Sequence, residues 1–114
     1  MLNSQVQLND ERVALLRKFQ EIAPDFMAAE AAVLNQAYKE GALSSKTKRL
    51  IALAIALRPG CTNCILAQTQ KALDAGATRD EIIETLKVEI AMSGTTGIAE
   101  SLRVIKFLDE LGIL

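Results

Sequence analysis

Hydrophobic residues recur at helical spacing along most of the chain, and the pattern predicts a series of amphipathic helices. Over residues 9–22 an apolar residue returns every three positions, which is typical of a helix with one buried face. The apolar positions there are Val13, Leu16, Phe19 and Ile22. Residues 1–8 show no such pattern, and we expect them to form a flexible arm. Pro24 and Asp25 suit the first turn of the next helix, which we expect to end at Gly41.

The middle of the chain is more hydrophobic. Residues 50–57 have no polar face at all, which predicts a core helix buried on every side. Ser44 or Ser45 can cap its N-terminus. The helix must stop at Arg58-Pro59-Gly60, because proline cannot continue it and glycine frees the backbone. A further helix is expected from Cys61 to Gly76.

Two more helices are predicted after Gly76. Thr78 and Glu81 have the spacing of a capping box, which opens the first of them. Its expected buried stripe consists of Ile82, Ile83, Leu86, Ile90 and Ala91, with Glu84 and Glu89 on the solvated side. The second covers about residues 98–111, with Leu102, Ile105 and Leu108 pointing inward. No strand pattern competes, so we expect an all-α fold of about six helices in a single domain, residues 1–114.

Composition adds an expectation about assembly. Half of the 114 residues are hydrophobic, yet there are only three Phe, one Tyr and no Trp. Such a small, apolar chain has more hydrophobic surface than one subunit can hide, so we expect a homo-oligomer. A net charge of −1 without a basic face argues against nucleic-acid binding. There is no signal-peptide pattern and no apolar run of the ~20 residues that would span a bilayer, so we expect a cytoplasmic location without membrane insertion.

The two cysteines, Cys61 and Cys64, are expected in the first turn of a helix. Unpaired N–H groups and the helix dipole stabilise a thiolate there, and a spacing of three places both thiols on one face. Thiol–disulfide chemistry is the favoured interpretation, and two small buried packing residues are the alternative. With two cysteines and no histidine, one subunit cannot supply four zinc or iron–sulfur ligands. A four-thiolate site shared by two subunits stays open; otherwise no metal or cofactor is expected.

Several motifs together resemble a known family. They are Gly41-Ala42-Leu43-Ser44, Lys46-Thr47-Lys48, Leu50-Ile51-Ala52-Leu53-Ala54, Cys61-x-x-Cys64, Ala72, Gly76-Ala77-Thr78 and Glu81-Ile82. Across residues 25–112 the chain is similar to the carboxymuconolactone decarboxylase family, and specifically to its thiol branch, the alkylhydroperoxidase D-like (AhpD-like) proteins. The resemblance implies an all-helical fold and assembly into trimers or hexamers. The decarboxylase branch lacks the CxxC motif, so the cysteines argue against a decarboxylase reaction.

The resemblance also implies a catalytic cycle. Cys64 would attack a peroxide and become a sulfenic acid, and Cys61 would resolve it into a disulfide. A lipoamide- or thioredoxin-type dithiol would then reduce that disulfide. A nearby second thiol makes chemical sense, because it prevents over-oxidation of the first.

The chain departs from the family pattern at the proton relay. Arg49 stands where the family has a glutamate, and Gln68 where it has a histidine. Gln68 can hydrogen-bond a thiolate but cannot take its proton. Arg49, if it faces the cysteines, would lower their pKa by its charge; alternatively it is a solvated side chain beside Lys46 and Lys48. Tyr38 has no positional support as a proton donor, and we expect it to pack in the core.

The sequence therefore predicts an AhpD-like dithiol oxidoreductase acting on a peroxide or a small disulfide. Cys61 and Cys64 are its redox pair, and Arg49 and Gln68 are its tuning residues. The alternative function is a non-catalytic helical assembly or sensor module that keeps the cysteines for packing or as a switch.

Overall fold

The computed structural model describes residues 2–114, and this part of the chain forms six helices and no strands. The helices are α1 (Gln5–Ile22), α2 (Pro24–Tyr38), α3 (Ser45–Leu57), α4 (Thr62–Asp74), α5 (Arg79–Ser93) and α6 (Thr95–Glu110). The predicted all-α fold of about six helices is confirmed.

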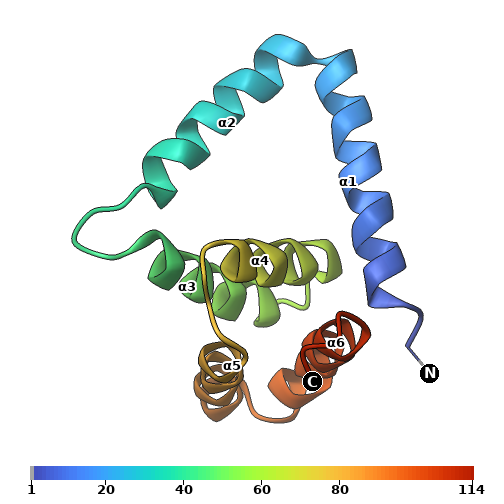
Figure 1. The fold of residues 1–114 in the computed structure, drawn as a ribbon, viewed down its shortest axis with the longest axis vertical. Coiled ribbons are helices and arrows are strands. Elements are labelled where there is room, and N and C mark those ends of the chain that lie inside the picture. The colour runs from blue at the N-terminus through green and yellow to red at the C-terminus, as the bar shows by residue number, and fades with distance from the viewer. Residues whose placement is uncertain (1) are drawn as a thin grey trace.

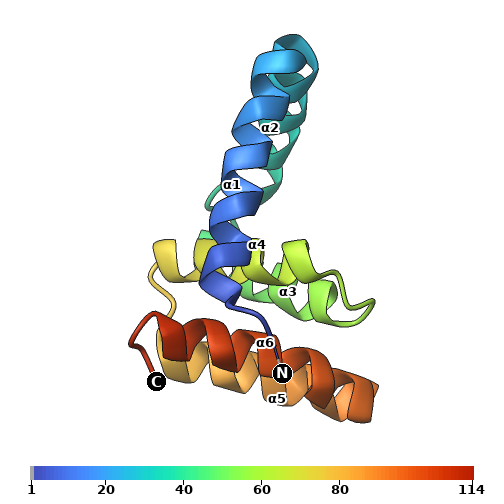
Figure 2. The ribbon, with the colours of Figure 1, turned by 90° about the vertical axis from the view of Figure 1, so that its right-hand side faces the viewer.

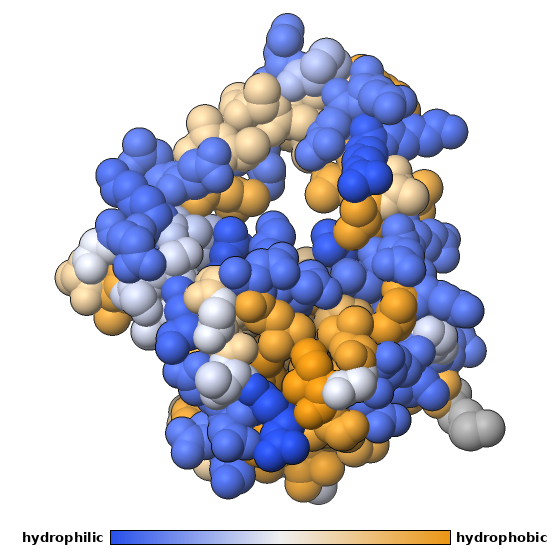
Figure 3. Space-filling model, viewed as in Figure 1, coloured by the Kyte–Doolittle hydropathy of each residue, from blue (hydrophilic) through white to orange (hydrophobic). Residues whose placement is uncertain are grey.

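The helices are arranged as a two-layered body with two projecting arms. In the body, α3 and α4 form one layer and α5 and α6 the other (Figure 2). The helices α1 and α2 rise from the body and meet at their far ends (Figure 1). The space-filling view shows an opening that these arms enclose together with the body (Figure 3).

The hydrophobic core lies between α3, α4, α5 and α6. Its fully or almost fully buried side chains include Leu53, Leu57, Ile65, Ile82, Leu86, Val104 and Leu108. The capping residues predicted from the sequence are present at the N-termini of α3 and α5. Ser44 accepts a hydrogen bond from the backbone N of Thr47 at 3.0 Å, and Thr78 and Glu81 form the full capping box. Pro24 occupies the first turn of α2, as predicted.

The arms bury little. Helix α2 contributes no buried residue, and the buried residues of α1 are the polar Gln5 and Asn9. Large apolar side chains of both arms are exposed, namely Leu15, Leu16, Phe19, Ile22, Phe26 and Val33. The predicted apolar face of the first helix is therefore present, but within one chain most of it has nothing to cover it.

The prediction that residues 1–8 form a flexible segment is wrong for residues 5–8, which form the first turns of α1. Gln5 is fully buried, and its backbone N donates to Oε1 of Glu110 at 2.7 Å. Ser4 also donates to that carboxylate, and this bond is the main reason that the pKa of Glu110 is lowered. The partner that orders this turn lies at the other end of the chain, so the local pattern could not indicate it. Met1 lies outside the described residues.

Several burial predictions need correction, and one of them is Ala91, which was expected in the buried stripe of α5 but is exposed. Helix α3 is not buried on every side, since Ile51 and Ile55 are 43% and 66% exposed. The reason is that only the side of α3 facing α4, α5 and α6 is covered within one chain. Leu102 is likewise exposed, and Ser101, Val104 and Leu108 form the inward face of α6 instead.

Glu89 is buried rather than solvated, with 4% of its surface exposed. It lies on the same face of α5 as Ile82 and Leu86, which the spacing of three and four residues requires. Its carboxylate reaches Gly97 in the first turn of α6, where an added Cβ would lie 2.6 Å from Oε2. The positive end of the α6 dipole favours a carboxylate there, and the missing side chain of Gly97 leaves the space.

Candidate functional site

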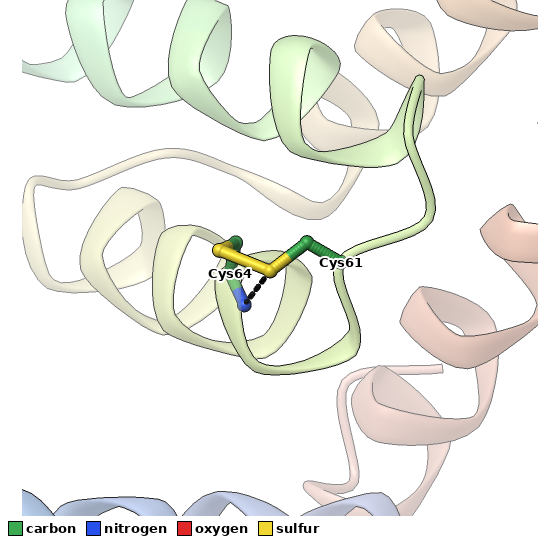
Figure 4. The surroundings of a disulfide bond; sticks show 2 residues. All are labelled: Cys61 and Cys64. Carbon is green, nitrogen blue, oxygen red and sulfur yellow. Dashed lines mark hydrogen bonds between the residues drawn. A yellow bond between two sulfur atoms is a disulfide. The ribbon is translucent and has the colours of Figure 1, made fainter.

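The two cysteines lie where α4 begins. Cys61 is the N-cap residue of α4, and Cys64 follows in its first turn. They form a disulfide in the structure, and the backbone N of Cys64 donates to Sγ of Cys61 at 3.3 Å (Figure 4). A sulfur in the N-cap position thus takes up one of the unpaired N–H groups of the helix end.

The turn before α4 fixes this position. Helix α3 ends at Leu57, and Gly60 adopts a φ of +77°, a conformation that side-chain-bearing residues rarely adopt. The backbone N of Cys61 then donates to the carbonyl of Ala56 at 3.3 Å. The break at Arg58-Pro59-Gly60 therefore folds α4 back against α3 and brings both cysteines to the junction of the two helices.

A cavity of about 310 Å³ opens beside the cysteines, in the groove between α3 and α4. Apolar side chains of α3 form much of its wall, and Cys64 is exposed while Cys61 is half-buried. Its lining residues are Tyr38, Ala52, Ile55, Ala56, Pro59, Cys61, Cys64 and Gln68. A small organic molecule with an apolar part can therefore reach the sulfur atoms from solvent.

The two sequence-predicted tuning residues meet at this cavity. Gln68 lines it, and Nη1 of Arg49 donates to Oε1 of Gln68 at 3.2 Å. Cζ of Arg49 also lies 3.4 Å from the ring centroid of Tyr38, in a cation–π contact. Arg49 is thus held on both sides rather than free in solvent beside its two neighbouring lysines.

Those lysines have other partners. Nζ of Lys46 lies 2.8 Å from Oε2 of Glu81, and Nζ of Lys48 donates to the carbonyl of Lys39 at 2.6 Å. Arg49 alone of the three turns toward α4.

Tyr38, which the sequence favoured as a core residue rather than a proton donor, lies at the candidate site. It lies at the cavity wall beneath Arg49, and it is half-buried rather than part of the core. The expectation of core packing is therefore corrected. Its place depends on how α2 sits over α3, and no local sequence signal reports such a tertiary contact.

Two further cations approach the same region. Lys71 lies three residues after Gln68 on α4, and burial lowers its pKa, assisted by the charges of Arg49 and Arg12; Glu30 opposes the shift. Burial also lowers the pKa of Arg12, on α1. Among residues 2–114, no salt bridge involves any of these three cations. The surroundings of Lys71 are thus positive on balance, with Glu30 as the opposing charge.

Residues 2–114 bring together no group of three or more His, Cys, Asp or Glu side chains that could hold a metal ion. None of the helices in the same range combines the length and the hydrophobicity needed to cross a membrane.

Comparison with known proteins adds a family and several relatives. The model of the carboxymuconolactone decarboxylase family matches residues 24–107. An uncharacterized protein of Cupriavidus necator is 35% identical over 88 residues, which cover 77% of this chain and 78% of the relative. An uncharacterized protein from the cox locus of Paracoccus denitrificans is 34% identical over 74 residues, covering 65% of this chain and 67% of the relative.

Two solved structures resemble the fold closely. One is a carboxymuconolactone decarboxylase family protein from Legionella pneumophila, with a TM-score of 0.85 and 30% identity. The alignment covers 93% of this chain and 95% of that one. The other is a protein from Thermotoga maritima, with a TM-score of 0.73 and 27% identity, covering 90% of this chain and 93% of that one.

Proposed function

Because this chain belongs to the carboxymuconolactone decarboxylase family, we propose that it works in the manner of the family's AhpD-like thiol branch, as a dithiol oxidoreductase. The observation that carries the proposal is the placement of Cys61 and Cys64. They pair at the N-terminus of α4, and they form part of the wall of an open, largely apolar cavity.

The reduced form needs a thiolate to react. Cys64 is the attacking residue because it is the more exposed of the two. The first turn of α4 supplies the positive end of a helix dipole, which stabilises a thiolate. Gln68 lies one helical turn after Cys64 on α4, and the Arg49 guanidinium that donates to Gln68 adds a positive charge on this side of the helix. In this proposal the helix dipole and the Arg49 charge stabilise the thiolate, and they take the place of the glutamate–histidine proton relay of the family.

Peroxide reduction then proceeds in two steps. The Cys64 thiolate attacks the terminal oxygen of a hydroperoxide and the O–O bond breaks, which leaves a sulfenic acid and an alkoxide that takes a proton from water. Cys61 then attacks the sulfenic sulfur, the S–O bond breaks, and hydroxide leaves with a proton as water. Two thiols and one hydroperoxide give one disulfide, one alcohol and one water.

Thiol–disulfide exchange uses the same pair. An external dithiol of the lipoamide or thioredoxin type attacks the Cys61–Cys64 disulfide, passes through a mixed disulfide, and leaves as its own disulfide. Two electrons and two protons return to the protein. Such cycling requires a reducing compartment, in keeping with a cytoplasmic location.

Assembly is part of the proposal. The exposed apolar side chains on α1 and α2, together with Ile51 and Ile55 on α3, are more than a stable monomer usually presents. We propose that further copies of the chain cover them in a trimer or hexamer. Replacing Phe19 and Phe26 by Asp should then reduce the mass measured by light scattering to that of one chain, with the helical circular dichroism of the body retained. An unchanged mass would refute this interface.

The redox function is tested by counting the free thiols of the protein itself over time, after small molecules have been removed by gel filtration, because reduced lipoamide carries two thiols of its own. Reduced protein receives one equivalent of cumene hydroperoxide in one tube and oxidised lipoamide in another, with Cys64→Ser as the matched control. We expect the loss of two thiols per chain in at least one tube, and no disulfide in the variant. Inertness in both tubes would overturn the redox proposal and favour the non-catalytic assembly or sensor module.

A further inference from the structure

A second cavity, of about 350 Å³, lies between the C-terminal parts of α3 and α5. The two helices belong to different layers of the body (Figure 2). Much of the cavity wall is apolar and is formed by Ala54, Ile55, Val88 and Met92. Of the residues described, Ile55 is the one that this cavity shares with the cavity beside the cysteines. It is therefore a separate site, which the redox proposal does not use.

Glu89 gives this cavity an acidic group. The residue is buried, yet neither oxygen of its carboxylate has a hydrogen-bond partner among residues 2–114. The dipole of α6 and the space at Gly97 make the position tolerable for a carboxylate, but they supply no hydrogen bond to it. A buried carboxylate without donors costs free energy, and a bound donor would recover part of that cost. A cationic donor does so most strongly, because both partners are then charged.

Two further polar side chains of the cavity also lack partners. Ser93 follows Glu89 by one helical turn on α5, and its hydroxyl is buried without a hydrogen-bond partner among residues 2–114. Arg58 directly follows the last residue of α3 and is exposed at the cavity. In the same part of the chain Arg58 forms no salt bridge, either with Glu89 or with another carboxylate. The cavity thus presents an anion and a cation that do not pair with each other.

We infer that this cavity binds a small zwitterion with an apolar chain, that is, a free amino acid of the leucine type. Its ammonium group donates to the Glu89 carboxylate and the Ser93 hydroxyl, and its carboxylate accepts from the Arg58 guanidinium. A ligand with a single charge would meet a like charge at Glu89 or at Arg58, whereas a zwitterion satisfies both. The cavity lies at the lower end of the range of about 300–1,000 Å³ that ligand pockets occupy, which suits a ligand of this size. The inference goes beyond the redox function and does not depend on it.

The first part of the experiment compares three probes with the same carbon skeleton. Leucine carries both charges, isocaproate lacks the ammonium group, and leucinamide lacks the carboxylate. Each is titrated into the full-length wild-type protein by calorimetry. We expect leucine to bind at least about tenfold more tightly than either of the others, since each loses one hydrogen-bonded charge. Equal binding of the three probes, or no binding of leucine, overturns the site.

The second part assigns each charge of the ligand to its partner. Glu89→Gln, which keeps the shape of the side chain, should weaken the binding of leucine and leucinamide but not that of isocaproate. Arg58→Gln should weaken the binding of leucine and isocaproate but not that of leucinamide. The matched controls are Glu84→Gln and Arg17→Gln, which remove exposed charges outside the cavity and should leave all three affinities unchanged. Should Glu89→Gln lose its helical circular dichroism, Ser93→Ala replaces it, with the same selective loss of the two ammonium-bearing probes expected.

Three other results would contradict the inference. An unchanged affinity for leucine in Glu89→Gln would overturn the role of the buried carboxylate. Tighter binding of leucine to Arg58→Gln than to wild type would mean that Arg58 itself occupies the carboxylate in solution. Binding that appears only after dissociation, with Phe19 and Phe26 replaced by Asp, would mean that another copy of the chain fills the cavity. Cys64→Ser should bind leucine as wild type does, so a failure of the redox proposal leaves this test intact.

Discussion

The body formed by α3 to α6 and the arms formed by α1 and α2 have similar helices but opposite surroundings. In the body, fully buried residues such as Leu53 and Ile65 form a continuous core. In the arms, Phe19 and Phe26 are 51% and 68% exposed, and α2 buries nothing. The stability of the body is therefore supplied within one chain, whereas the apolar faces of the arms are left uncovered by that chain. The cysteine cavity lies where the two regions meet, because Tyr38 from α2 completes a wall built by α3 and α4.

Truncation of a core side chain should show the largest contrast between the regions. Leu53→Ala in the body should lower the free energy of unfolding by about 2–5 kcal/mol, since it removes a buried side chain and leaves a cavity. Phe26→Ala should change the free energy of unfolding of the dissociated chain by less than about 0.5 kcal/mol. Urea denaturation monitored by circular dichroism measures both. Similar costs for the two variants would mean that the arms are packed in the monomer.

A smaller effect is expected where α5 meets α6. In Gly97→Ala, the new Cβ would lie 2.6 Å from Oε2 of Glu89 and 3.0 Å from Cα of Ile90, so the helices must shift. We expect a loss of about 1–3 kcal/mol in the free energy of unfolding. Gly41→Ala is the control, because its nearest neighbour is Nζ of Lys48 at 3.9 Å. Equal stability of the two variants would show that Glu89 is not packed against α6.

Loss of a helix cap in the body should have a smaller effect on the free energy of unfolding. Thr78→Ala should lower the free energy of unfolding by about 1 kcal/mol, since it leaves the backbone N of Glu81 without its side-chain acceptor. The corresponding position of α2, Ala23, has no side-chain cap. Ala23→Ser should therefore stabilise the arm helix, measured as slower amide hydrogen exchange in its first turn. No change in either variant would mean that capping does not limit these helix ends.

The smallest expected effect concerns pH. The hydrogen bond from Lys46 and that from the backbone of Thr78 hold the pKa of Glu81 below its ordinary value of 4.5. A depressed carboxyl pKa stabilises the folded state above the unfolded pKa, and the gain is lost as the pH falls through the folded pKa. Wild type should thus lose more thermal stability below pH 4.5 than Glu81→Gln does. Parallel acid titrations of the two proteins would contradict this.

Local signals predicted much of the fold, and tertiary contacts explain what they missed. Pro24, Ser44 and the Thr78–Glu81 box act within one turn of themselves, so the sequence located these helix starts. The N-terminal extension of α1 depends on Glu110, which is far away in the sequence, and could not be predicted. The CxxC motif and the start of α4 were also predicted, because both depend on neighbouring residues in the sequence. That Arg49 turns to Gln68 and stacks on Tyr38 depends on three helices meeting, which no periodicity reports.

Activation of Cys64 by its surroundings is the central claim, and the alkylation rate of the reduced protein tests it most directly. The rate with iodoacetamide is followed from pH 5 to pH 10, a span that brackets the ~8.5 of a free thiol, with Cys61→Ser to isolate Cys64 and Arg49→Gln added to remove the charge. We predict that the alkylation rate of Cys61→Ser reaches half its maximum well below pH ~8.5. When Arg49→Gln is added, this midpoint should move to a higher pH, because the guanidinium charge has been removed. A midpoint at or above that of a free thiol would contradict the claim and leave Cys64 an ordinary cysteine.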